Sequence, residues 1–372
     1  MSKVPFICSE DLWESGHGPA HPLKPERLRR TYELLKVYGA FENEAASLVE
    51  PQQASVEELC LFHTEEYVDV VQRLSRGESI FDAARYNFGP GDNPVWANMF
   101  EVEALKVGGA LLAADLVTEQ GVSIAFNFAG GMHHAGPARA SGFCVFNDAA
   151  VAINHLLRKG LRVAYVDIDA HHGDGVQYAF YDTDRVLTIS LHESGQYLFP
   201  GTGFVSEMGE GAGRGYAVNL PLPPYTGDEV YLWAFRQVVP PLVEAFRPDV
   251  LVSQLGVDTH YLDPLTHLSL TTEAYIQVVK GIKELAPRWL ALGGGGYNVE
   301  GVARAWCLAY GVMLDVEFPD QLPEPYRNKY GGSSLRDSRK PVLDEQLKGF
   351  VQNGVERSVE EVKSKIFPVV IG

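Results

Sequence analysis

RVAYVDIDAHHGD, residues 162–174, joins a predicted buried strand to a cluster of acids and histidines. Its first part, RVAYVDID (162–169), is apolar on both faces, which is typical of a strand in a parallel sheet covered by helices. Asp169, His171 and Asp174 then follow at the end of that strand. Open α/β sheets bind ligands just beyond the carboxyl ends of their strands. The segment therefore predicts both an α/β sheet and a site at one edge of it.

The same arrangement recurs along the chain. Further strands are predicted at VPFIC (4–8), VSIAFNF (122–128), RVLTISL (185–191), DVLVSQLG (249–256) and RWLALGG (288–294). Segments of helical period lie between them, at 26–38, 55–75, 94–119, 147–159, 227–246, 271–286 and 299–315. No linker, repeat or low-complexity tract divides the chain. We expect one α/β domain over residues 1–372, built on an open, doubly wound, mainly parallel sheet with helices on both faces.

The last part of the chain has a different pattern. From about Asp320 onward, Pro, Arg and Lys precede an amphipathic helix predicted over 340–366. This stretch carries no cluster of chemically active residues. We expect residues 320–372 to form a C-terminal helical extension that packs on the core or makes a subunit contact.

Composition excludes several classes of function. The chain has 31 Lys and Arg against 48 Asp and Glu, a net charge of −17, which disfavours nucleic-acid binding because that needs a basic face. The first residues lack the pattern of a secretory signal, and no run of about 18 apolar residues predicts a membrane span. The four cysteines are scattered singly. We therefore expect a reduced, cytoplasmic protein.

Three residues after two of the strands are candidate metal ligands. Alternate side chains of an extended strand share a face, so Asp169 and His171 can point at one ion. Asp258 follows the apolar run LVSQLG, where an unpaired carboxylate would be costly. Together they would leave open positions for water and substrate, as catalytic sites do. The alternatives are a loop-solvating pair at 169–171 and a helix N-cap at Asp258.

A tandem pair of histidines follows the strand at 122–128. His133 and His134 lie in the Gly-rich segment AGGMHHAG, and Asp167 and Asp174 are free to orient them. One imidazole could face a metal-bound water and the other a substrate oxygen. The alternative is a pair of hydrogen-bonded core residues, which the flanking glycines make less favourable.

A run of four glycines precedes Tyr297. GGGGY (293–297) lacks the Lys-Ser/Thr of a phosphate-binding loop. Glycine allows a close backbone approach to a metal and can aim the Tyr297 hydroxyl at an oxyanion. The alternative is a flexible turn with a packed tyrosine.

Taken together, these motifs resemble the zinc-dependent histone deacetylase family, most closely its bacterial acetoin-utilisation branch. The resemblance runs in order over residues 5–315, through HPLKPERL, YNFGPGDNP, AGGMHHAGPARASGFCVFND, VDIDAHHGDGVQYAFYDTDRV, SLHESGQYLFPGTG, QLGVDTHYLDPL and GGGGYN. It implies the open arginase/deacetylase sheet, in agreement with the strand pattern.

The resemblance also implies roles for single residues. Zinc ligands fall on Asp169, His171 and Asp258, although Fe²⁺ would accept the same ligands. Catalytic residues fall on His133, His134, Asp167, Asp174 and Tyr297. Substrate contacts fall on Asp92, Phe143, Phe199, Leu265, Gly142 and Gly295. Structural potassium sites fall on Asp167, Asp169, His171, Ser190 and Leu191 near the zinc, and on Phe180, Thr183, Val186 and Tyr216 further away.

The implied reaction is hydrolysis of Nε-acetyl-lysine in a protein or peptide, with His134 as the expected proton shuttle. The family branch indicates a metabolic enzyme such as acetyl-CoA synthetase as the substrate, and the absence of a basic arm argues against histones. Gly173 stands where related two-manganese ureohydrolases carry a ligand, so that activity is disfavoured. The alternatives are an acetylpolyamine amidohydrolase and, less favoured, a non-catalytic reader of acyl-lysine.

Overall fold

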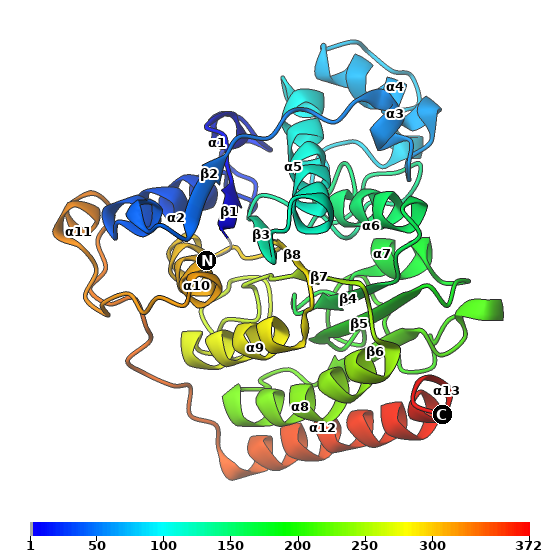
Figure 1. The fold of residues 1–372 in the computed structure, drawn as a ribbon, viewed down its shortest axis with the longest axis vertical. Helices are drawn as coiled ribbons and strands as arrows, with labels where there is room; N and C mark the ends of the chain where they lie inside the picture. Colours follow the sequence, from blue (N-terminus) through cyan, green and yellow to red (C-terminus); the bar gives the residue numbers. More distant parts are fainter. Residues whose placement is uncertain (1–2) are drawn as a thin grey trace.

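The computed structural model describes residues 3–372 and shows one parallel sheet (Figure 1). Its strands are β1 (Val4–Ile7), β2 (Ala46–Val49), β3 (Ile124–Asn127), β4 (Val163–Asp167), β5 (Val186–Glu193), β6 (Ala217–Leu222), β7 (Val250–Gln254) and β8 (Trp289–Leu292). They lie in the order β2-β1-β3-β8-β7-β4-β5-β6, and every neighbouring pair is parallel. The predicted fold class, a single parallel α/β sheet, is confirmed.

Helices cover both faces of the sheet. In the described residues they are α1 (Asp11–Glu14), α2 (Glu26–Val37), α3 (Val56–Leu59), α4 (Glu65–Ser75), α5 (Met99–Glu119), α6 (Asp148–Arg158), α7 (Asp174–Ala179), α8 (Asp228–Phe246), α9 (Thr272–Leu285), α10 (Val299–Leu314), α11 (Glu324–Tyr330), α12 (Glu345–Lys365) and α13 (Phe367–Val370). α5 and α6 lie on one side, and α8, α9 and α10 on the other (Figure 1). No helix in residues 3–372 combines the length and apolar character needed to cross a membrane.

Strand β8 shows why the strand runs are apolar throughout. Leu290 and Leu292 are fully buried in the same cluster as residues of α5 and α6. Trp289 and Ala291 point the other way, into the cluster that contains α8, α9 and α10. Since successive side chains of a strand alternate in direction, a strand between two helical layers must be apolar at every position.

Two strands were not predicted, and both are outermost in the sheet. β2 (Ala46–Val49) is partly exposed, and β6 (Ala217–Leu222) contains Pro221, which cannot donate to a neighbouring strand. The helix predicted over 55–75 was wrong as a single element. It is divided into α3 and α4, because Ser55 and Thr64 each cap the N-terminus of a separate helix.

The C-terminal part of the chain packs on the rest. α12 begins at Glu345 rather than at residue 340, with the Asp344 side chain accepting from the Leu347 N–H. It lies along α8 (Figure 1), and the Ser358 hydroxyl donates to the Pro221 carbonyl of β6 at 2.7 Å. Val351, Val355, Val359 and Val362 form its buried stripe.

Candidate active site

Sheet order brings the polar loops together. The loops after β3, β8, β7 and β4 carry His133–His134, Tyr297, Asp258 and Asp169–His171 respectively, and these four strands are consecutive neighbours. Because all four are parallel, their carboxyl ends share one edge. Residues separated by more than a hundred positions therefore meet.

Asp169, His171 and Asp258 form a cluster suited to a metal ion. One ligand atom from each lies within 4.8 Å of the others. The His171 Nδ1 atom lies 3.1 Å from Asp169 Oδ1 and 2.9 Å from Asp258 Oδ2. All three side chains are buried. Burial, reinforced by the charge of Asp169, raises the pKa of Asp258 well above its usual range, because two adjacent buried carboxylates oppose each other's ionisation.

Main-chain and amide groups fix the orientation of both carboxylates. Asp169 Oδ2 accepts from the Gln254 amide at 2.6 Å and from the Gly295 N–H at 2.8 Å. Asp258 Oδ1 accepts from the Ala170 N–H at 2.7 Å. Such outer hydrogen bonds hold metal ligands in place.

Glycine is required beside these carboxylates. A Cβ atom on Gly295 would lie 2.4 Å from Asp258 Oδ2 and 2.6 Å from Asp169 Oδ2. A Cβ on Gly256 would lie 2.2 Å from Asp169 Oδ2. All three distances are shorter than real carbon–oxygen contacts, so a side chain at either position would displace the candidate ligands.

His133 and His134 are each held by a carboxylate. The Nδ1 atom of His133 lies 2.7 Å from Asp167 Oδ2, and that of His134 lies 2.7 Å from Asp174 Oδ1. The two Nε2 atoms are 3.0 Å apart. Each carboxylate thus leaves the Nε2 atom of its own histidine facing the site.

The two imidazoles differ in basicity. Burial opposes charge on His133, but the carboxylates of Asp167 and Asp169 outweigh it and raise its pKa to about 9. Burial and the adjacent His133 lower the pKa of His134 to about 4. Near neutral pH the pair therefore carries one proton in excess, on His133, and His134 is a free base.

Tyr297 lies over the same cluster. Its ring centroid is 6.3 Å from that of His171 and 5.6 Å from that of Phe143. Its main-chain N–H donates to Asp263 Oδ2 at 2.7 Å, which anchors the loop after β8. Burial, followed by the charges of Asp258 and Asp169, raises the pKa of Tyr297 well above its usual range. The hydroxyl therefore stays protonated and remains a donor.

Two phenylalanines flank the site from different loops. Phe199 is 44% exposed and its ring lies 5.1 Å from that of His134, whereas Phe143 faces Tyr297. Gly142 packs closely against His134 and Phe199. A Cβ atom at this position would lie 2.4 Å from the His134 ring and 2.9 Å from the Phe199 ring. Phe143 itself has φ 71°, stabilised by Asn93 Oδ1, which accepts from its N–H at 3.1 Å.

The other two predicted substrate residues make contacts of their own. Asp92 is exposed, and its main-chain carbonyl accepts from His21 Nε2 at 3.2 Å. Leu265 is half-buried, and its N–H donates to Asp263 at 2.9 Å. A narrow cavity at the base of the site is lined by Leu23, Gly131, Met132, His133, His134, Gly142, Phe143, Cys144, Asp169, Gly294, Gly295 and Tyr297.

The residues implied for potassium lie in two groups. Asp167 of β4 and Ser190 of β5 are paired across the sheet, next to Leu191. Phe180, Thr183 and Val186 lie between the end of α7 and the start of β5, and the Tyr216 carbonyl accepts from the Thr188 N–H of β5 at 2.9 Å. Potassium binding at these positions stays a prediction.

Several supporting residues were not predicted. Gln254, a polar residue at the end of an otherwise apolar strand, reaches Asp169, and the Tyr165 hydroxyl donates to Asp167 at 2.8 Å. Asp148, which is fully buried, accepts from the N–H groups of Gly131 and Met132 at 2.9 and 2.7 Å and so shapes the histidine loop. The signal that could have identified such residues is a polar side chain at the end of an apolar strand or at the start of a buried helix.

The fold and the site define a class of enzyme. The histone deacetylase domain matches residues 21–313, and the chain belongs to that family of hydrolytic deacetylases. It is 43% identical over 333 residues to the acetoin utilization protein AcuC of Bacillus subtilis, covering 87% of this chain and 86% of that protein. It is 37% identical to human histone deacetylase 1 over 98% of this chain and 74% of the relative.

Solved structures agree with the sequence comparison. A crystal structure of an HDAC homolog complexed with SAHA has a TM-score of 0.89 and 35% identity, covering 97% of this chain and 100% of the other. An HDAC homolog from Aquifex aeolicus has a TM-score of 0.87 and 35% identity, with 96% and 100% coverage.

Proposed function

We propose that this deacetylase uses zinc to hydrolyse Nε-acetyl-lysine in proteins, releasing acetate and free lysine. The convergence of Asp169, His171 and Asp258 beside the His133–His134 pair carries the proposal. Two carboxylates and one imidazole are a donor set that zinc accepts, and three protein ligands leave positions for water and substrate. Two buried carboxylates also need a nearby cation. Bound there, zinc would polarise the acetyl carbonyl and acidify a water molecule. Fe²⁺ would fit the same donors.

The histidines have separable tasks. His134, with a pKa lowered to about 4, is the uncharged base that would accept the proton of the attacking water, in place of its bond from His133 Nε2, and return that proton to the departing lysine amine. His133, held by Asp167 and with a pKa raised to about 9, keeps its proton and supplies positive charge beside the reaction. Asp174 orients the His134 ring through Nδ1.

The remaining residues hold the substrate. The protonated Tyr297 hydroxyl donates to the oxyanion that forms when the amide carbonyl is attacked. Phe143 and Phe199 contact the lysine methylenes, with Gly142, Gly295 and Leu265 beside them. Asp92, exposed at the rim, accepts from the main chain of the substrate. Structural potassium at the two groups described above is part of the same proposal.

We also propose a cellular setting for this reaction. Similarity to proteins named for acetoin utilization supports a metabolic enzyme, such as acetyl-CoA synthetase, as the acetylated substrate. The four cysteines are all free, in agreement with a reducing cytoplasm. Residues 1–372 would act as one deacetylase domain, with 320–372 packed on it.

A substrate panel on metal-reconstituted protein tests the proposal. The protein is stripped of metal, reloaded with zinc, iron or cobalt, and supplied with acetyl-lysine peptides or N-acetylputrescine. Release of acetate from peptides, with competition by SAHA and no release by Asp258→Ala, supports it. Preference for N-acetylputrescine would support the polyamine alternative, which the net charge of −17 favours electrostatically. No turnover with any metal would contradict the proposal and favour a non-catalytic reader.

A further inference from the structure

The residue Asp337, after α11, links the C-terminal part of the chain to the candidate active site. Its side chain is only 4% exposed. It accepts from His260 Nε2 at 2.8 Å, from the Thr272 N–H at 2.8 Å and from Arg304 Nη1 at 2.9 Å. These partners come from the loop after β7, the start of α9 and the middle of α10. One carboxylate thus joins three separate elements.

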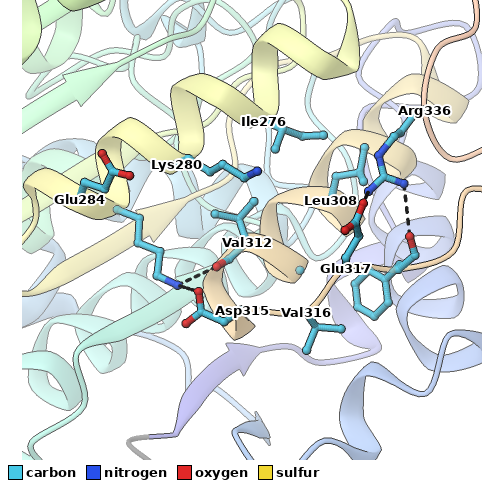
Figure 2. Close-up of a pocket in the computed structure, with 12 residues that line it drawn as sticks. Ile276, Lys280, Glu284, Leu308, Val312, Asp315, Val316, Glu317 and Arg336 are labelled. Carbon is cyan, nitrogen blue, oxygen red and sulfur yellow. Dashed lines mark hydrogen bonds and ion pairs between the residues drawn. The ribbon is translucent and has the colours of Figure 1, made fainter.

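The segment that carries Asp337 is itself fixed. Leu335 is fully buried, and its N–H donates to the Asp320 carbonyl at 2.6 Å. The Arg336 guanidinium contacts Glu317 and donates to the Phe318 carbonyl, both at 3.2 Å, where it lines a surface pocket against α10 (Figure 2). The Asp337 N–H donates to Thr272 Oγ1 at 2.9 Å. Asp337 is therefore presented by a rigid turn.

The hydrogen bonds of His260 show which ring nitrogen donates to Asp337. Its Nδ1 atom accepts from the Leu262 N–H at 3.3 Å, so the ring proton belongs on Nε2. That proton points at Asp337 Oδ2. The imidazole therefore makes two bonds, one to its own loop and one to the C-terminal segment.

His260 lies in the loop 258–263, which has a candidate metal ligand at one end. The residue at its other end forms a hydrogen bond with the main chain of Tyr297. Asp258 begins it, and Asp263, whose N–H donates to the His260 carbonyl at 2.8 Å, ends it. Asp263 Oδ2 then accepts the Tyr297 N–H at 2.7 Å. A shift at His260 would move both Asp258 and Tyr297.

We propose that Asp337, acting through His260, is a positioning residue that holds the loop 258–263 in its active geometry. Asp337 lies beyond residue 313, where the match to the histone deacetylase domain ends. This inference rests on the proposed zinc site, since it assigns His260 and Asp337 to the support of Asp258. It gives the C-terminal segment a role in the chemistry rather than in packing alone.

Variants of His260 test the link without leaving Asp337 unpaired. His260→Phe keeps an aromatic ring but removes the Nε2 donor and the Nδ1 acceptor. Asp337 keeps its hydrogen bonds to Arg304 and Thr272 in this variant. His260→Gln restores a side-chain donor. His155→Phe is the matched control, because it removes a 2.7 Å bond from His155 to Asp115 while Lys159 still pairs with that carboxylate at 2.6 Å, and α6, which carries His155, holds none of the proposed zinc ligands.

Chelator competition measures the zinc affinity of each variant. An acetyl-lysine peptide is the substrate for measuring kcat and KM, and thermal unfolding of the metal-free protein measures stability. We expect His260→Phe to bind zinc about tenfold more weakly and to lose about tenfold in kcat, with KM nearly unchanged, as for other partners that orient metal ligands. His260→Gln should recover most of both losses, and His155→Phe should show neither.

Three outcomes would overturn the inference. Wild-type zinc affinity and kcat in His260→Phe would show that the loop is fixed without His260, even if thermal stability falls. Equal losses in His155→Phe would show general destabilisation. Absence of zinc binding by the unaltered protein would instead overturn the proposed metal centre and this inference with it.

Discussion

The Nε2 atoms of His133 and His134 face each other at 3.0 Å, while the Nδ1 atoms of the two rings bind different carboxylates. With both Nδ1 atoms donating to Asp167 and Asp174, the Nε2 contact is a hydrogen bond only when the pair holds one extra proton. A pKa raised to about 9 for His133 and one lowered to about 4 for His134 place that proton on His133. The adjacent histidines are thus chemically unequal.

This inequality predicts the effect of removing the base. His134→Ala should lower kcat by about 10²- to 10⁴-fold, the usual contribution of a general acid–base group, with zinc retained. Single-turnover kinetics and metal analysis of the purified variant check this. A His134→Ala variant with kcat near that of the unaltered protein would assign the proton transfer elsewhere.

Tyr297→Phe removes only the proposed oxyanion donor. Loss of one such donor costs about 3–4 kcal/mol of transition-state stabilisation, so kcat should fall by about 10²- to 10³-fold. Bound zinc should be unchanged, because the Asp263 bond is to the Tyr297 main chain. Turnover at the normal rate in this variant would remove the hydroxyl from the mechanism.

Gly295→Ala should abolish metal binding although it replaces none of the three candidate ligands. Its Cβ would lie 2.4 Å from Asp258 Oδ2, and that carboxylate is completely buried, so one of the two groups must shift. Gly349→Ala in α12 is the control, because nothing lies within 4 Å of its Cβ and alanine favours helix by about 1 kcal/mol. Zinc content after dialysis measures the difference. Retention of zinc by Gly295→Ala would argue against the three-residue site.

The buried imidazole of His63 should make the folded protein less stable as the pH falls. It is 3% exposed, its Nε2 accepts from the Asn147 N–H at 3.0 Å, and burial lowers its pKa to about 3. The unfolded chain, with an ordinary histidine pKa of about 6.5, binds the proton more readily. The contribution to stability is therefore complete above about pH 6.5 and is lost as pH falls toward 3.

Denaturant unfolding between pH 7 and 4 checks this. His63→Gln should be less stable at pH 7 but should lose stability less steeply with falling pH than the unaltered protein. Parallel curves for His63→Gln and the unaltered protein would contradict the assignment.

Periodicity and residue type were sufficient for most of the fold. Strands such as β4 and β8 are buried on both faces, so their sequences are apolar throughout and their ends are marked by Asp, His or Gly. β2 and β6 are the outermost strands and lack a continuous apolar sequence. β2 is partly exposed, and β6 contains Pro221. The same limit explains α3 and α4, whose separation depends on capping by Ser55 and Thr64 rather than on apolar period.

The candidate ligands and the histidines were predicted from residue type at strand ends, but their supporting contacts were not. Gln254, Asp148 and Asp337 are single polar residues whose partners are distant in sequence, so no spacing rule connects them. The C-terminal segment has no cluster of chemically active residues in its sequence, and the role proposed for Asp337 depends on where the chain turns back toward His260.

The position of α12 has a consequence for self-association. β6 is the last strand of the sheet, and α12 packs beside it with Ser358 already bonded to the Pro221 carbonyl. An uncovered terminal strand offers unpaired main-chain groups to any other extended chain. We therefore expect a protein shortened before Glu345 to leave β6 more open to strand addition and to self-associate more readily.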